Sequence, residues 1–486
     1  MKLLKDILYK VEMLEVAGST NIAISSIDFD SRKIIKDGLF VAIKGTQVDG
    51  HLYIEKAIQQ GAIAIVAEEL PLTKPNHITY VRVKNSSQSL ALIASNFYNN
   101  PSEKLKIVAI TGTNGKTSIA TLLHQFYQSI GEKAGLLSTI NNKIGFNVIK
   151  STHTTPDAIS INKLLAQMVS QSCKYCFMEA SSHAIHQNRM FGLKLAGAIF
   201  TNISHDHLDY HHTFDDYILA KKALFDSLPS EAFALVNKDD RHGLTMLHHC
   251  SAKSYTYAVK SLADFKAKVI ESQFEGTLIN IAGHEVWTKL IGQFNVYNLL
   301  AIYSTTLLLG QDELQALTSI SALNCAQGRF EVYRSDNGVI GVIDYAHTPD
   351  ALLNVLNTIN EIKTEQQLIT VFGCGGDRDK GKRSKMGLIA SELSQKVIIT
   401  NDNPRSENPE SIIQDIVSGI TKSNLKKVLT ISDRKTAIKT ACTLANCGDI
   451  ILIAGKGHEQ YQEIDGTKFP FDDKEELMNT FKHLAE

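Results

Sequence analysis

The feature that most constrains the fold of this chain is the alternation of short apolar runs, polar loops and helical patterns along almost its whole length. The stretches "KLKIVAITGTNGKTSIATLLHQFYQ" and "GVIGVIDYAHTPDALLNVL" each indicate a buried strand, a tight turn and a helix. Because such units pack helices against mostly parallel sheets, we expect an α/β fold. In open sheets of this kind, ligands bind at the carboxyl ends of the strands.

The length of 486 residues suggests about three domains. Residues 1–88 carry short strands and end near "KNSSQ". Residues 89–330 open with the first of the two stretches quoted above, and residues 331–486 open with the second. The last segment contains four strand-then-loop units in succession, which is typical of a doubly wound, Rossmann-like domain.

The composition argues for a soluble, reduced, cytoplasmic enzyme. The formal net charge of -1 gives no reason to expect a nucleic acid or a membrane as partner. No apolar run approaches the roughly 20 residues of a membrane-spanning helix, and the start "MKLLKDILYKVEML" predicts an amphipathic helix without a secretory core. The seven cysteines are scattered, and Cys173 and Cys176 fall in a predicted buried strand, so no disulfide framework or zinc pattern is expected.

A shortened phosphate loop lies in "ITGTNGKTS". Gly112 and Gly115 let consecutive backbone N–H groups point at an anion, and the following helix N-terminus favours negative charge. Lys116 can reach the outer phosphates and Thr117 can offer its hydroxyl to Mg²⁺. Ile110 stands where the strict phosphate-loop motif has its first glycine, so the motif is a variant.

The stretch "FTNISHDHLDYHHTFDDYILAKKALF" gathers imidazoles and carboxylates before a predicted helix. Read alone, it predicts either a zinc site or a solvated polar turn, and its residues of interest are His205, Asp206, His207, Asp209, His211 and His212. The helical pattern places Lys221 or Lys222 partly inward. A desolvated lysine has a lowered pKa and a more nucleophilic amine, which can take up CO₂ as a carbamate.

Two further polar loops follow predicted strands. "MEASSHAIHQNRM" offers Glu179, a natural Mg²⁺ ligand at a strand end, and Arg189, which can hold a carboxylate or phosphate. "NDNPRSENP" brings a carboxylate, an amide, a rigid corner and a guanidinium together in Asp402, Asn403, Pro404 and Arg405.

One ordered set of motifs resembles the Mur ligase family over essentially the whole chain. In chain order, the set comprises the phosphate loop, "SSH", "SHDHLDYH", Tyr-x-x-x-Lys, "GRFE" and "DYAHTP". Members of this family are ATP-dependent amide-forming ligases of peptidoglycan precursor synthesis. The resemblance is strongest to members that add the third residue of the stem peptide. It implies a UDP-sugar domain, a central ATPase domain and a Rossmann-like domain for the incoming amino acid, in a protein that is usually a monomer.

For the UDP-N-acetylmuramoyl-L-Ala-D-Glu substrate, the resemblance implies a uridine site and a dipeptide site. The implied residues are Ser31 in "DFDSR", Thr46, Gln47 and Val48 in "GTQVDG", Thr154 and Thr155 in "THTTPD", and Ser181, Gln187 and Arg189. His153 stands where relatives often carry asparagine, and no role is assigned to it.

For ATP and Mg²⁺, the resemblance implies binding by the phosphate loop and by residues facing it from the far side. The ATP residues are Gly112, Thr113, Asn114, Gly115, Lys116, Thr117, Arg329, Asp344 and His347. The implied metal residues are Thr117, Glu179, His207 and carbamylated Lys221, so the histidine cluster becomes a Mg²⁺ site. The implied catalytic residues are Lys116, Glu179, His207 and Lys221.

In the family, the "DNPR" motif selects meso-diaminopimelate over lysine, because a guanidinium reads the extra distal carboxylate. The implied contacts to this amino acid are Arg383, Asp402, Asn403, Pro404, Arg405, Gly455 and Glu459. The family reaction passes the γ-phosphoryl group of ATP to the D-glutamate carboxylate, and an amine then displaces phosphate from the acyl phosphate. The alternatives are a lysine-adding ligase, folylpolyglutamate synthase and a nucleotide-gated module with a dead site.

Overall fold

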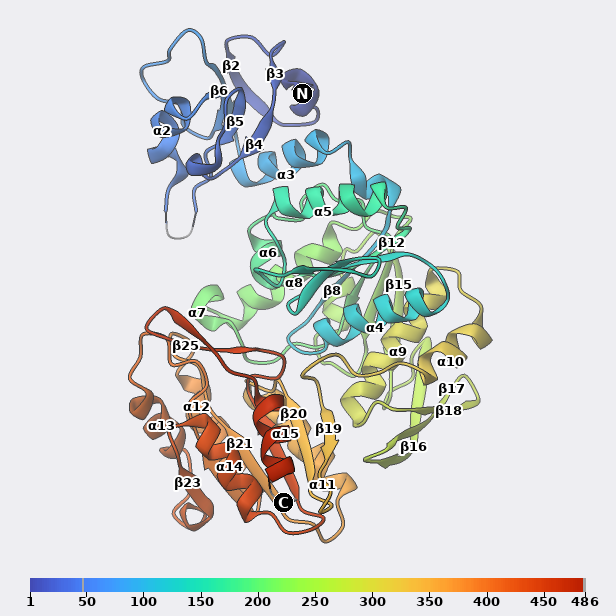
Figure 1. The fold of residues 1–486 in the computed structure, drawn as a ribbon. Coiled ribbons are helices and arrows are strands. Elements are labelled where there is room, and N and C mark those ends of the chain that lie inside the picture. Colours follow the sequence, from blue (N-terminus) through green and yellow to red (C-terminus); the bar gives the residue numbers. More distant parts are fainter. Residues whose placement is uncertain (46–47, 484–486) are drawn as a thin grey trace.

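The computed structural model describes residues 1–45 and 48–483, and within these ranges the chain forms three large sheets stacked from top to bottom in Figure 1. Each sheet draws its strands from one continuous stretch of sequence. Helices cover the sheets, as the alternation of patterns predicts, and the α/β fold class is confirmed.

The amino-terminal part, blue in Figure 1, is a small sheet with flanking helices. Its strand order is β2 (Met13–Ala17), β7 (Thr79–Val83), β6 (Ala62–Ala67), β5 (Gly38–Val41) and β4 (Ser26–Asp28). The remaining elements are the pair β1 (Lys2–Leu3) and β3 (Ala23–Ile24) and the helices α1 (Leu4–Ile7), α2 (Ile54–Gln59) and α3 (Ser86–Phe97).

The predicted amino-terminal helix is wrong over most of its length. Only Leu4–Ile7 is helical, and Met13–Ala17 forms the edge strand β2, which pairs antiparallel with β7. The apolar spacing still places Leu4 and Ile7 in the core. Pairing with a strand far along the chain outweighs the local helical preference here.

The central sheet is parallel from β9 to β16, with antiparallel hairpins at both edges. Its order is β11 (Asn147–Lys150), β10 (Asn141–Ile144), β9 (Ala134–Leu137), β12 (Tyr175–Glu179), β8 (Lys106–Thr111), β13 (Gly197–Phe200), β14 (Phe233–Asn237), β15 (Lys253–Ala258), β16 (Phe265–Gln273), β17 (Gly276–Ile281) and β18 (His284–Thr288).

Both faces of the central sheet are buried, because successive side chains of β8 point to opposite faces. Val108 and Ile110 pack with α4 (Lys116–Ser129), α9 (Gln293–Leu308) and α10 (Glu313–Ser321). Ile107 and Ala109 pack on the other face with α5 (Ala158–Ser170) and α8 (Phe214–Asp226).

The carboxyl-terminal sheet, orange to red in Figure 1, is parallel apart from its first strand. Its order is β19 (Glu331–Arg334), β20 (Ile340–Asp344), β24 (Ile450–Ala454), β21 (Leu368–Phe372), β22 (Lys396–Ile399) and β23 (Val428–Thr430). One face packs α11 (Pro349–Ile362), α12 (Gly381–Leu393) and α13 (Pro409–Val417), and the other packs α14 (Arg434–Leu444) and α15 (Asp473–His483). A hairpin of β25 (Tyr461–Ile464) and β26 (Thr467–Pro470) follows β24.

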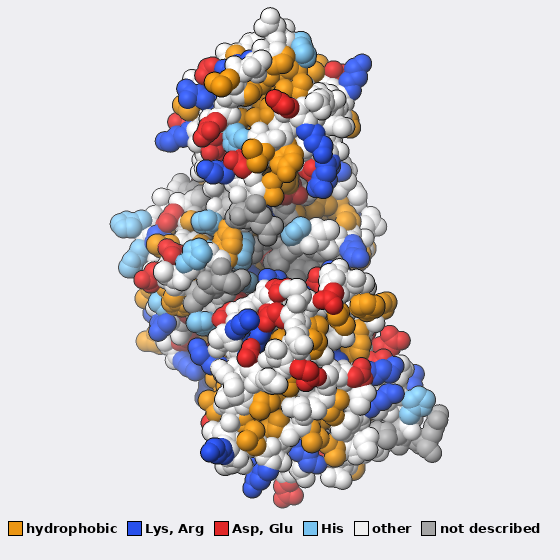
Figure 2. Space-filling view, turned by 90° about the vertical axis from the view of Figure 1, so that its left-hand side faces the viewer, with side chains coloured by type: hydrophobic (Ala, Val, Ile, Leu, Met, Phe, Trp, Pro, Cys, Tyr) orange, Lys and Arg blue, Asp and Glu red, His pale blue; other side chains and the backbone are white. Residues whose placement is uncertain are grey.

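The surface carries mixed charge. Figure 2 shows acidic and basic side chains interspersed over the face in view, in agreement with the net charge of -1. None of the helices in the described residues has the length and apolar character needed to cross a membrane. Cys173 and Cys176 are buried free thiols beside and within β12, as the strand interpretation predicts.

Candidate active site

Three polar loops of the central part meet at one edge of its sheet. Strand β8 lies between β12 and β13, and all three run parallel. The loop after β8 is the phosphate loop, β12 ends at Glu179, and β13 leads into the segment with His207. The sheet order therefore brings the phosphate loop, a carboxylate and an imidazole to the same edge.

The phosphate loop is held by close backbone contacts. Gly112 has φ +150°, and a Cβ there would lie 1.8 Å from Oγ1 of Thr201. Gly115 has φ +86° and begins helix α4. The ammonium of Lys116 donates to the carbonyl oxygens of Gly112 and Thr113, both at 2.8 Å. Burial lowers the pKa of Lys116, so an anion that enters this loop meets a poorly solvated cation.

Glu179 is fixed beside the phosphate loop. It is 1% exposed, and its Oε2 accepts a hydrogen bond from the Thr117 hydroxyl at 2.9 Å. Its Oε1 accepts from the backbone N–H of Thr139 at 2.7 Å. Arg329, which comes from beyond the central sheet, donates from Nη2 to the same Thr117 hydroxyl at 3.3 Å.

The two adjacent lysines of α8 face different surroundings. Lys221 is 1% exposed, and its amine donates to the Gly112 carbonyl oxygen at 2.9 Å. Lys222 forms an ion pair with Asp226 one turn further along the helix. Burial, with the charge of Lys116 as the next cause, holds the pKa of Lys221 well below its usual range. Of the two candidates, Lys221 is the one with the desolvated amine that carbamate formation requires.

The donor set at this edge is compatible with Mg²⁺. Among the described residues, no group of three or more His, Cys, Asp or Glu side chains is arranged to hold a metal ion. Mg²⁺ needs only one or two protein ligands, because phosphates and water complete its shell. Glu179 and Thr117 meet that need, and burial lowers the pKa of His207, which keeps its imidazole neutral.

The predicted dipeptide residues come from two segments that meet beside Glu179, residues 154–155 after β11 and residues 181–189 after β12. The Thr155 hydroxyl donates to the Glu179 carbonyl oxygen at 2.7 Å and contacts the Ser181 hydroxyl at 3.3 Å. Arg189 donates from Nη1 to the Thr155 carbonyl oxygen at 2.7 Å, and its other nitrogens bond Oε1 of Gln187.

Tyr210 supports these segments from α7 (Leu208–His211), because its hydroxyl accepts from Nε2 of Gln187 at 3.0 Å. The Thr154 hydroxyl accepts from that of Thr139 at 3.1 Å, and His153 is exposed. Both Thr154 and His153 line the cavity described next.

A cavity of about 450 Å³ lies between the central and carboxyl-terminal parts. One wall consists of the phosphate loop, Glu179, His207, Lys221 and four of the dipeptide residues, Thr154, Thr155, Ser181 and Arg189. The other wall comes from the carboxyl ends of four neighbouring strands, β20, β21, β22 and β24. The residues on that wall are Tyr345, His347, Gly375, Arg378, Asp379, Lys382, Asp402, Asn403, Arg405, Gly455 and Glu459.

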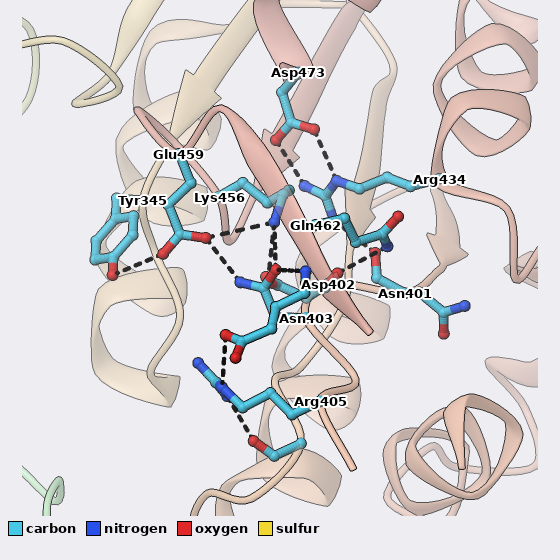
Figure 3. A network of polar contacts seen from close by, with 12 residues as sticks. Tyr345, Asn401, Asp402, Asn403, Arg405, Arg434, Lys456, Glu459, Gln462 and Asp473 are labelled. Carbon is cyan, nitrogen blue, oxygen red and sulfur yellow. Dashed lines mark hydrogen bonds and ion pairs between the residues drawn. The ribbon is translucent and has the colours of Figure 1, made fainter. Parts of the chain in front are cut away.

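The second wall is a dense polar network (Figure 3). Asn403 donates from Nδ2 to Oε2 of Glu459 at 2.8 Å, and its Oδ1 accepts from the Lys456 ammonium at 2.9 Å. Gly455 has φ +116°, and a Cβ there would lie 2.5 Å from Oδ2 of Asp402. Burial and the charge of Asp402 raise the pKa of Glu459 above its usual value.

Arg405 is held in an unusual backbone conformation, with φ +51°. Its N–H donates to the Glu463 carbonyl oxygen at 3.0 Å, and its carbonyl oxygen accepts from Asp465 at 2.8 Å. The hairpin of β25 and β26 thus clamps the residue on both sides. Such strained conformations persist where the surrounding structure fixes them, often at ligand sites.

The structure does not bring Arg383 to the cavity. Its guanidinium is fully buried and donates to Glu407 and Asp415, with Nη1 to Asp415 at 2.9 Å. Arg378, from the same stretch "GDRDKGKR", lines the cavity instead. The stretch offers two arginines, Arg378 before α12 and Arg383 within it, and the buried partners of Arg383 keep it from the cavity.

A second cavity of about 600 Å³ lies on the other side of the phosphate loop. Its lining includes Asn114, Arg329, Asp344 and His347 from the predicted ATP set. Burial raises the pKa of Asp344 to about 6 and lowers that of His347 to about 4. Asn114 donates from Nδ2 to Asp350 of α11 at 2.9 Å, so the phosphate loop and the carboxyl-terminal part are in direct contact here.

Of the predicted uridine residues, Ser31 and Val48 are described; they belong to the amino-terminal part and line neither cavity. Ser31 follows β4 and Val48 follows β5 in the chain. Because these strands are parallel neighbours, their carboxyl ends, which the two residues follow, lie at the same edge of the sheet. Val48 is exposed and Ser31 is buried. Thr46 and Gln47 lie outside the described residues.

Arg378, Tyr345 and Lys456 were not singled out in the sequence. All three follow strands, namely β21, β20 and β24, so position after a strand was the available signal. Tyr345 stacks on the Arg329 guanidinium at 4.4 Å and bonds Glu459 at 3.4 Å. Because Arg329 also donates to the Thr117 hydroxyl, it links Tyr345 to the phosphate-loop wall of the 450 Å³ cavity.

Comparison with known proteins yields matches over the whole chain. Three family models match: "Mur ligase family, catalytic domain" over residues 23–98, "Mur ligase middle domain" over residues 110–305, and "Mur ligase, glutamate ligase domain" over residues 328–457.

Two curated relatives carry the name UDP-N-acetylmuramoyl-L-alanyl-D-glutamate–2,6-diaminopimelate ligase. The one from Cytophaga hutchinsonii is 52% identical, covering 98% of this chain and 99% of the relative. The one from Bacteroides thetaiotaomicron is 50% identical, covering 99% and 100%. A solved structure of a ligase with the same name is 33% identical, covers 100% of this chain and 99% of its own, and superposes with a TM-score of 0.71.

Proposed function

Because the chain belongs to the Mur ligase family, we propose that it is the ATP-dependent ligase that joins meso-2,6-diaminopimelate to UDP-N-acetylmuramoyl-L-alanyl-D-glutamate in peptidoglycan precursor synthesis. The observation that carries this proposal is the shared cavity. The phosphate loop with Glu179 forms one wall, and the polar network around Arg405 and Glu459 faces it. A phosphoryl donor and a zwitterionic amino acid therefore have sites that face each other.

We assign the UDP-sugar to residues 1–88, with Ser31, Thr46, Gln47 and Val48 at the uridine. ATP belongs to residues 89–330 and the incoming amino acid to residues 331–486. The D-glutamate end of the sugar peptide would lie on the two segments with Thr154, Thr155, Ser181, Gln187 and Arg189. The hydrogen bonds from Arg189 to Gln187 and Thr155 support a preformed carboxylate site there.

In the first chemical step, the γ-phosphoryl group passes from ATP to the D-glutamate carboxylate, and ADP leaves. Lys116 would neutralise charge on the phosphates, since such transfer depends mainly on positioning and electrostatics. Mg²⁺, held through Thr117, Glu179, His207 and carbamylated Lys221, would supply further charge neutralisation when bound. Arg329, Asp344 and His347 would contact the nucleotide from the carboxyl-terminal side.

In the second step, an amine of the amino acid attacks the acyl carbon, the amide C–N bond forms and phosphate leaves. The acyl phosphate must be kept from water, and the contact between Asn114 and Asp350 supports a closed arrangement during the reaction. We assign the distal carboxylate of meso-diaminopimelate to Arg405 and Arg378, and its ammonium to Asp402, Asn403 and Glu459, because all five residues line the cavity. We propose that the enzyme acts as a cytoplasmic monomer.

The decisive experiment measures phosphate release from ATP with the UDP-muramoyl dipeptide and either meso-diaminopimelate or L-lysine. Release with meso-diaminopimelate alone is the expected result. Release with L-lysine alone would keep the reaction and overturn the assigned selectivity. No release with either amino acid would overturn the proposed function in favour of the folate-ligase or inactive alternatives.

A further inference from the structure

Lys456 is a fully buried lysine in the loop after β24, between Gly455 and Glu459, and the reaction scheme above gives it no role. A buried ammonium is costly unless it is paired and hydrogen-bonded. Figure 3 shows its Nζ pointing at the side chains of the loops after β22 and β24. Its partners therefore indicate what it does.

The ammonium of Lys456 contacts three groups of the proposed amino-acid site. It donates to Oδ1 of Asn403 at 2.9 Å, and it lies 3.4 Å from Oε2 of Glu459 and 3.7 Å from Oδ1 of Asp402. A lysine has donors and no acceptor, so the Asn403 amide must turn its oxygen toward Lys456. The Asn403 nitrogen then faces Glu459, as the 2.8 Å bond between them requires.

The backbone N–H of Glu463 also donates to Oδ1 of Asn403, at 2.9 Å, and supports the same amide orientation. What Lys456 adds is charge. Among the described residues, Lys456 is the cation whose nitrogen lies within 4 Å of the carboxylates of Asp402 and Glu459, so these two carboxylates share one ammonium at contact distance. Arg434 instead pairs with Asp473 at 2.7 Å, and Arg405 lies 3.5 Å from Glu463.

We propose that Lys456 is a positioning residue for the amino-acid substrate: it balances one of the carboxylates of Asp402 and Glu459, so that the site presents one net negative charge to one substrate ammonium. The proposal rests on the proposed function, because it takes these residues as the amino-acid site. Without Lys456, two like charges would share a buried site, and one ammonium would not match them. Lys456 acts through Asn403, Asp402 and Glu459 and has no bond to make or break in the reaction.

The test is a steady-state assay of the full chain with the Lys456→Met variant, which keeps the apolar stem and removes the charge. We expect the KM for meso-diaminopimelate to rise about 10–100-fold, the usual effect of losing a charged hydrogen bond. The KM values for ATP and for the UDP-muramoyl dipeptide should stay within about twofold. Lys435→Met, the same change at an exposed lysine of α14 paired with Glu476, is the matched control and should change no KM.

A charge-balance role also predicts coupling between Lys456 and Glu459. Glu459→Gln alone should raise the KM for meso-diaminopimelate. Adding Lys456→Met to that variant should raise the KM for meso-diaminopimelate no further, because the double variant lacks both the Glu459 carboxylate and the Lys456 ammonium that balances it. This comparison still decides the question if the Lys456→Met protein alone does not fold.

Three results would overturn the role of Lys456. The first is that Lys456→Met changes the KM for meso-diaminopimelate less than twofold, and the second is that it raises all three KM values equally. The third is that adding Lys456→Met to Glu459→Gln raises the KM for meso-diaminopimelate a further tenfold. These results are distinct from failure of the proposed function. That failure would show as a wild-type chain that releases no phosphate with meso-diaminopimelate.

Discussion

The buried amine of Lys221 donates a hydrogen bond of 2.9 Å to the carbonyl oxygen of Gly112, 109 residues earlier in the chain. The contact ties helix α8 to the phosphate loop. Because Lys221 is buried and lies near Lys116, its pKa is well below its usual range, which favours the uncharged form of its amine. Lys222, its neighbour, pairs with Asp226 instead.

The first prediction concerns this lysine. Lys221→Ala should lower the rate of phosphate release by about 10²–10³-fold, the usual effect of losing one preorganised electrostatic contact. Short-chain carboxylates such as acetate should restore part of the rate, because they can replace the carbamate. Lys222→Ala should retain its rate within about twofold. A fully active Lys221→Ala enzyme would refute the carbamate role.

The second prediction concerns selectivity. Arg405→Lys should raise the KM for meso-diaminopimelate by about 10–100-fold, since an ammonium cannot replace a guanidinium that reads a carboxylate with two N–H groups. Turnover with L-lysine should change less, so the ratio of kcat/KM for meso-diaminopimelate to kcat/KM for L-lysine should fall. Arg334→Lys, at an arginine paired with Glu275 on the surface, is the matched control. An unchanged preference in Arg405→Lys would assign selectivity to another residue, with Arg378 the next to test.

The third prediction concerns Gly455. A Cβ at this position would lie 2.5 Å from Oδ2 of Asp402, and its φ of +116° is unfavourable for alanine. Gly455→Ala should therefore raise the KM for meso-diaminopimelate by displacing Asp402. Gly448 also has a positive φ, +86°, but nothing lies within 4 Å of a Cβ there. Gly448→Ala should lower stability by about 1 kcal/mol and leave the KM unchanged; equal KM values for both variants would count against a role for the Asp402 contact.

The fourth prediction concerns stability against pH. Hydrogen bonds from the buried Arg383 are the main cause that lowers the pKa of Glu407 to about 2, from an ordinary 4.5. A carboxyl with a lowered folded-state pKa stabilises the fold above pH 4.5 and loses that contribution as the pH falls toward 2. Glu407→Gln should therefore cost about 3 kcal/mol at neutral pH, since each pKa unit corresponds to about 1.4 kcal/mol.

Urea unfolding of the wild type and Glu407→Gln between pH 7 and pH 3 would measure this difference. The gap in stability should shrink as the solution becomes more acidic. Glu392→Gln, at an exposed position of the same helix as Arg383, should show no such gap. A gap that stays constant with pH would mean that the ion pair with Arg383 contributes no net stability.

Much of the fold and site could be predicted because the signals are local. The strand, glycine turn and helix around Lys116 lie within one short stretch, and so do the strand and loop that carry Asp402 and Arg405. Helix α8 was predicted from its apolar periodicity, which also limited the inward lysine to Lys221 or Lys222. The amino-terminal helix was wrong because Met13–Ala17 gains its hydrogen bonds from β7, a partner that no local pattern reveals.

The α/β class, the phosphate loop, the family and the set of strand-end loops could be predicted, because each depends on residues close together in the chain. Which charged side chains reach the cavity depends instead on contacts between distant segments. Arg383 is held by Glu407 and Asp415, 24 and 32 residues away, and so it leaves the cavity wall to Arg378. Lys456 is likewise bonded to Asn403, which lies in the loop after another strand, β22. A buried charged side chain is stable only beside oppositely charged partners, and packing between distant segments determines where those partners lie.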